Sequence, residues 1–129
     1  MALLVLFGQV PVVAAAEVLQ VRGANLLQVG DQNRSYPVRL GCIAIDPADS
    51  QAAADWLRQR LPRRTRVNLR PLGSESGVLI SQVTLLSSGD DLGSGLVGAG
   101  LARRLPADAA PLACPDHSPA DLTTQTRQG

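Results

Sequence analysis

The clearest helical pattern in this chain lies in its middle, at residues 51–61, and it constrains the fold more than any other feature. Asp49 or Ser50 can cap the start of this segment, and Pro62 ends it. The apolar residues spaced for one helix face are Ala53, Trp56, Leu57 and Leu61. We therefore expect an amphipathic helix with Trp56 in the core, and the rest of the domain must supply the surface on which it packs.

Strand-forming segments lie on both sides of this helix. The expected elements are two strands within residues 18–29 around a turn at 22–25, a strand over 36–45, strands over 65–72 and 78–86, a loop over 87–95, and a short second helix over 96–105. Periodicity alone predicts a small α+β barrel or sandwich. The order of three strands, helix, two strands and helix is that of the OB-fold, a five-stranded Greek-key barrel that is mainly β.

The composition limits what such a barrel can contain. Aromatic residues make up only 2% of the chain, so the core must be built from aliphatic side chains. A surface of stacked rings for single-stranded nucleic acid is disfavoured for the same reason. The length of 129 residues fits one domain with short tails, and we expect a monomer. The formal net charge of +1 predicts no overall attraction to nucleic acid or membranes.

Residues 2–16 are almost wholly apolar and end in three alanines. The run is shorter than the ~20 residues that span a bilayer, and its end fits a secretory signal cleaved after Ala16. No basic residue precedes the run, so an uncleaved anchor or a buried strand remains the alternative. We expect a signal peptide at 1–16, a domain at 17–105, and export to the periplasm, a lumen or the medium.

The remaining residues, 106–129, contain four of the nine prolines and little apolar periodicity, which predicts a poorly ordered tail. In an oxidising compartment Cys114 of this tail could pair with Cys42. The alternative is that Cys42 is a buried free thiol in an apolar strand. His117 is the only histidine, so a metal site around it is not expected.

Five short segments, in order, resemble the staphylococcal-nuclease-like (thermonuclease) domain family over residues 18–105. They are V-R-L at 38–40, A-A-A-D-W-L at 52–57, P-R-R-T-R-V at 62–67, G-V-L-I-S-Q-V at 77–83 and V-G-A-G-L-A at 97–102. The resemblance implies an OB-fold barrel. It also implies descent from calcium-dependent enzymes that hydrolyse the phosphodiester bonds of DNA or RNA.

The family's functional positions are mostly substituted in this chain. By the resemblance, Arg39 is the one retained residue and corresponds to an arginine that binds phosphate. The two calcium-binding carboxylates fall on Ala24 and Ala44, and the general-base glutamate falls on Pro47. The second phosphate-binding arginine falls on Val78. Because a hard cation needs several oxygen ligands, we expect phosphodiesterase activity to be lost, with no cofactor, and the chain to act as a binding or structural module.

A second alignment leaves an enzyme open. A two-residue insertion after Leu40 would bring Asp46 and Asp49 into the carboxylate positions and preserve the face of the strand on which they lie. The chain would then be a weak or divergent calcium-dependent nuclease that uses Arg39, Asp46 and Asp49. This alignment does not replace the carboxylate missing at Ala24 or the arginine missing at Val78.

Arginines are concentrated in the helix and the segment that follows it. The group consists of Arg58, Arg60, Arg63, Arg64, Arg66 and Arg70. One interpretation is an anion-binding patch for nucleic acid phosphates, lipid headgroups or an acidic protein. The other is an ordinary solvated surface. The sequence does not name the partner.

Overall fold

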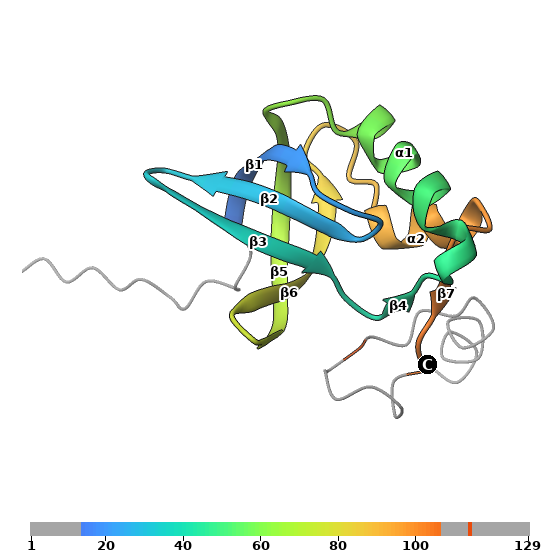
Figure 1. The fold of residues 1–129 in the computed structure, drawn as a ribbon. Coiled ribbons are helices and arrows are strands. Elements are labelled where there is room, and N and C mark those ends of the chain that lie inside the picture. Colours follow the sequence, from blue (N-terminus) through green and yellow to red (C-terminus); the bar gives the residue numbers. More distant parts are fainter. Residues whose placement is uncertain (1–13, 107–113, 115–129) are drawn as a thin grey trace, which may run out of the picture.

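The computed structural model describes residues 14–106 and Cys114. The strands are β1 (Ala14–Val21), β2 (Leu26–Asp31), β3 (Arg34–Leu40), β4 (Ile43–Ala44), β5 (Thr65–Glu75), β6 (Val78–Leu85) and β7 (Arg103–Arg104). Five of them close into a barrel in the order β1-β2-β3-β6-β5, with β3 and β6 parallel and the other pairs antiparallel (Figure 1). This order confirms the predicted OB-fold class.

The barrel interior is filled by aliphatic side chains. Alternate residues of each strand point inward, so that Val67 and Leu69 of β5 are buried while Arg66 and Arg70 are exposed. The central residues of the core include Val18, Leu27, Val29, Val38, Leu57 and Val83. The strand predicted over 65–72 is therefore present, and its alternation places basic side chains on the outer surface of β5.

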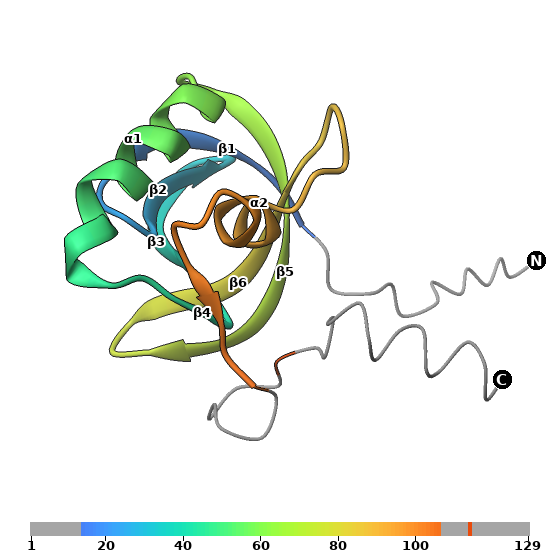
Figure 2. The same cartoon turned by 90° about the vertical axis from the view of Figure 1, so that its right-hand side faces the viewer.

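Helix α1 (Ser50–Arg60) follows a short 3₁₀ turn, η1 (Pro47–Asp49), and helix α2 (Leu92–Gly98) lies near it. Figure 2, which looks from the side of α2, shows this helix in front of the barrel strands with α1 beside it. Helix α1 buries Ala53, Ala54 and Leu57, but Trp56 is only half-buried. The prediction of a core tryptophan is thus correct only in part, because one edge of the ring packs against Gly95 and its face lies under Arg60.

The predicted strand over 36–45 is wrong at its end. Strand β3 stops at Leu40, and Cys42 adopts a left-handed backbone with φ 64°. The amide of Gly41 donates to the carbonyl of Ser81, which holds the bend against β6. The residues after the bend form β4 and pair with β7 instead of continuing along the barrel.

The second helix also differs from its prediction over 96–105. It begins at Leu92, within the expected loop, because the carboxylate of Asp91 caps it by accepting from the amide of Ser94. It ends at Gly98, and Gly100 turns the chain with φ 78°. The last residues of the predicted helix therefore form β7.

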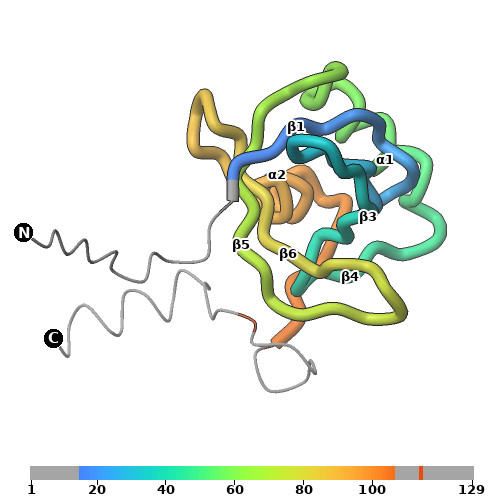
Figure 3. Tube along the Cα trace, turned by 90° about the vertical axis from the view of Figure 1, so that its left-hand side faces the viewer, coloured from blue at the N-terminus to red at the C-terminus, as the bar shows by residue number. Residues whose placement is uncertain are grey.

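The predicted signal boundary falls inside a strand. Residues 14–16 belong to β1 and pair with Leu69, Asn68 and Val67 of β5. Figure 3 shows the start of β1 beside β5. Residues 1–13 and all of the predicted tail except Pro106 and Cys114 lie outside the described residues. Cleavage after Ala16 therefore remains a prediction. No described helix is long and apolar enough to cross a membrane.

Candidate functional site

Arg39 lies on the outer surface of β3, between the buried residues Val38 and Leu40. Its guanidinium lies 3.6 Å from the carboxylate of Glu75, the last residue of β5. Both side chains are well exposed, at 37% and 53%, so the ion pair is largely solvated. The sequence does not point to Glu75 as a partner of Arg39, because only the register of β5, β6 and β3 brings the two residues together.

The other positions that the resemblance singles out lie on separate elements. Ala24 lies in the β1–β2 turn, Ala44 in β4, Pro47 in η1, and Val78 begins β6. Their side chains offer neither an oxygen ligand nor a cationic group. Within residues 14–106 and at Cys114, no group of three or more His, Cys, Asp or Glu side chains is placed to hold a metal ion.

The two aspartates of the second alignment do not form an ion pair with Arg39. Asp46 instead accepts a hydrogen bond from Arg103 of β7 at 3.4 Å. Asp49 precedes α1 as its N-cap residue, but its side chain forms no capping hydrogen bond. The structure thus brings Arg39 together with Glu75, and it places Asp46 beside a different arginine.

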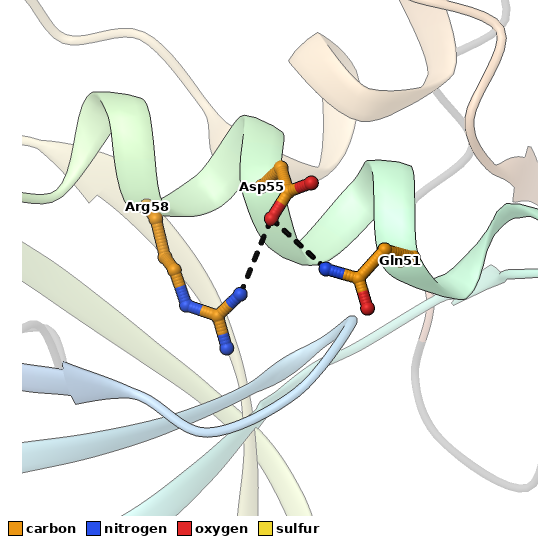
Figure 4. A network of polar contacts seen from close by, with 3 residues as sticks. All are labelled: Gln51, Asp55 and Arg58. Atoms are coloured by element: carbon orange, nitrogen blue, oxygen red, sulfur yellow. Dashed lines mark hydrogen bonds and ion pairs between the residues drawn. The ribbon is translucent and has the colours of Figure 1, made fainter.

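Three of the six arginines in the predicted patch, Arg58, Arg60 and Arg70, do not line a pocket with the other three. Arg58 is paired within α1, where the Asp55 carboxylate accepts from it at 3.3 Å and from Gln51 at 3.1 Å (Figure 4). The guanidinium of Arg60 lies over the Trp56 ring, 3.8 Å from the ring centroid. Arg70 lies further along β5, opposite Gln82.

The other three arginines of the patch line a groove that we call the arginine groove. It has a volume of about 600 Å³ and lies between the β2–β3 hairpin, β1 and the start of β5. Figure 1 shows this hairpin projecting from the side of the barrel away from α1 and α2. The charged residues of the groove are Arg34, Arg63, Arg64 and Arg66, with Glu17 and Asp31. Four cations against two anions give the groove a net positive charge of two.

Hydrogen bonds and turns hold the arginine groove in shape. The backbone of Arg64 is left-handed, with φ 74°, and its amide donates to the carbonyl of Val18 in β1. Its side chain pairs with Glu17 at 3.0 Å, and Arg63 donates to the carbonyl of Leu19 at 3.3 Å. The chain after Pro62 is therefore fastened to β1 by both backbone and side chains.

The charges in the groove are unequally neutralised. Arg34 lies 3.8 Å from Asp31, and its guanidinium also lies over the Tyr36 ring at 5.6 Å. Arg66 forms no ion pair or side-chain hydrogen bond with any other residue in the described part of the chain. Its guanidinium is thus available for an anion, with five donors in a planar fork.

A second cavity, of about 530 Å³, lies between α1, α2 and the end of β6. Trp56, Arg60, Asp90 and Asp91 contribute to its lining. Arg60 already covers the tryptophan face, and the carboxylates oppose it in charge. One arginine and two aspartates give this cavity a net charge of minus one, opposite in sign to that of the arginine groove.

Cys42 and Cys114 form a disulfide with a Cα–Cα distance of 5.5 Å. Cys42 lies at the bend after β3, and its carbonyl also accepts from the amide of Leu105. The disulfide and this hydrogen bond together fix the chain after β7 to the end of β3.

Comparisons with known proteins supply no identity: no family model and no curated protein matches this chain. The resemblance drawn from the five segments accordingly remains a prediction, and the geometry of the barrel and its groove is the ground for a functional proposal.

Proposed function

We propose that this protein is a non-catalytic OB-barrel module that binds an anionic partner in the arginine groove. One observation carries the proposal: four arginines and two carboxylates line a single groove, and the guanidinium of Arg66 has no partner among the described residues. Arginine forks match the geometry of carboxylate, sulfate and phosphate oxygens, which favours an oxyanion as ligand.

The non-catalytic part of the proposal rests on side-chain chemistry. The groups next to Arg39 and Asp46 are single oppositely charged partners, Glu75 and Arg103. Cleavage of a phosphodiester needs converging cationic donors, and the loss of one such contact commonly costs ~2.7–4 kcal/mol of transition-state stabilisation. With alanine, proline and valine at the other family positions, we infer that little catalytic advantage remains.

Binding of inorganic polyphosphate tests the groove, because this probe carries charge but neither a base nor a sugar. We expect Arg66→Glu to weaken polyphosphate binding about tenfold or more, since it both removes a cation and adds an anion. Arg70→Glu is the matched control: it makes the same change on the same strand, away from the groove. Equal effects of the two variants would reject the groove as the binding site.

A calcium-stimulated DNA-degradation assay tests the absence of catalysis. We expect no cleavage above background by the purified protein. Cleavage that requires calcium and disappears in Arg39→Ala would overturn this part of the proposal and support the nuclease that uses Arg39, Asp46 and Asp49.

A further inference from the structure

The two walls of the arginine groove differ in chemistry. One wall carries Arg63 and Arg64 from the turn before β5 and Arg66 from the start of β5. The other is the tip of the β2–β3 hairpin, where Asp31, Gln32 and Asn33 supply carboxylate and amide groups. A ligand that fits both walls needs anionic groups on one side and several neutral hydrogen-bonding groups on the other.

Aromatic stacking is absent from this groove. None of the residues that line it in the described part of the chain is aromatic. Tyr36 and Trp56 are the only rings among the described residues; Tyr36 lies close under Arg34, and Trp56 lines the other cavity. Single-stranded nucleic acids gain ~1–3 kcal/mol for each base stacked on a ring, and this groove offers none of that energy.

The carboxylates of the groove add hydrogen-bond acceptors to its lining. Glu17 and Asp31 lie among the arginines, each close to one of them, Arg64 and Arg34. A carboxylate and an amide are good partners for hydroxyl groups, because both accept and the amide also donates. Polar lining of this kind therefore favours hydroxyl-rich ligands.

We propose that the ligand of the arginine groove is an acidic saccharide that bears sulfate or carboxylate groups. This inference rests on the proposed function and names the class of its ligand. Arg63 and Arg66 bind the sulfate or carboxylate groups of the saccharide, while Gln32 and Asn33 bind its hydroxyl groups. The volume of about 600 Å³ lies within the ~300–1,000 Å³ typical of sites for drug-sized ligands, so a short oligosaccharide segment fits.

Fluorescence anisotropy tests the saccharide assignment with two labelled probes of equal charge. One is a sulfated heparin-derived oligosaccharide, and the other is an oligothymidylate. We expect the saccharide to bind at least about tenfold more tightly at equal ionic strength, because only it satisfies both walls. Arg66→Glu should abolish this binding, and Arg70→Glu should leave it unchanged.

The hairpin wall is tested by Asn33→Ala. We expect this variant to weaken saccharide binding several-fold and to leave polyphosphate binding unchanged, with an unchanged melting temperature showing that the hairpin still folds. Equal or tighter binding of oligothymidylate, or an equal loss of both ligands in Asn33→Ala, would overturn the saccharide assignment. Polyphosphate binding that depends on Arg66 would still stand in that case, whereas failure of every polyanion to bind would overturn the proposed function itself.

Discussion

At the scale of single residues, the contact between Gly95 and Trp56 shows how closely the two helices are fitted. A Cβ atom built at Gly95 would lie 2.5 Å from Cη2 of the Trp56 ring. No real Cβ could remain at that distance, so the ring or α2 would have to shift. Packing therefore requires a glycine at position 95, although the sequence around it predicts a loop over 87–95.

We expect Gly95→Ala to destabilise the protein by about 1–3 kcal/mol, the usual cost of overpacking a fitted contact. Gly98→Ala is the control in the same helix, because a Cβ there meets nothing within 4 Å. That change should be neutral or stabilising by up to ~1 kcal/mol, since alanine favours a helix over glycine. Urea unfolding of both variants measures the difference, and equal stabilities would contradict the packing argument.

Tyr36 gives a prediction for alkaline pH. Burial of the phenol raises the pKa of Tyr36 above its ordinary value of 10.0, Asp31 raises it further, and Arg34 opposes them. The folded state therefore keeps its proton after the unfolded state has lost it. The corresponding stability is fully present below pH 10.0 and is lost as the pH rises through the folded pKa.

The measurement is favoured by composition, because this chain has no lysine and Tyr36 is its only tyrosine. We expect the free energy of unfolding of the unaltered protein to fall between about pH 9 and pH 11. The free energy of unfolding of the Tyr36→Phe variant should fall by less over the same range. The two proteins should differ little at neutral pH. If the free energy of unfolding fell equally in both proteins across this pH range, Tyr36 would not be the cause of the fall.

At the scale of elements, β1 is the strand whose beginning matters most. Three of its pairs with β5 come from residues 14–16, and Ala16 is buried. The predicted cleavage after Ala16 would remove these pairs and leave those of Glu17 and Val18. Cleavage at the predicted signal boundary would remove residues 14–16, whereas the full length of β1 includes them.

We expect a protein that begins at Glu17 to be less stable than one that begins at Ala14, by about 1–3 kcal/mol, from lost ladder hydrogen bonds and the exposure of β5. Thermal unfolding of the two proteins measures this difference. Mass spectrometry of the protein recovered after expression with its own leader would locate the cleavage site. Identical melting temperatures would show that residues 14–16 add nothing to the barrel.

At the scale of the whole molecule, the Cys42–Cys114 disulfide joins residues 72 positions apart. A cross-link of this span stabilises by about 4 kcal/mol in the chain-entropy model, because it restricts the unfolded chain. We expect Cys42→Ser, or reduction, to lower the free energy of unfolding by about 2–4 kcal/mol. Peptide mapping without reductant should recover the two cysteines in one fragment, and recovery of two alkylated thiols would contradict the pairing.

Part of this molecule is determined by its sequence alone. Val67 and Leu69 alternate with polar residues and so must face one side of a strand, and Pro62 must end α1. These are local properties, since they depend on side-chain size, polarity and the backbone limits of neighbouring residues. Together with the order of the strands and helices along the chain, they are enough to predict the barrel class, its aliphatic core and the exposed arginines of β5.

Only the tertiary structure decided where the polar groups meet. The hydrogen bond from Gly41 to Ser81, the pairing of Arg39 with Glu75, and the shared groove of Arg66 and the β2–β3 hairpin join segments far apart in the chain. Such contacts depend on strand register and barrel closure, which no local pattern specifies. The sequence thus determined which side chains are exposed, and the folded barrel determined which of them form a site.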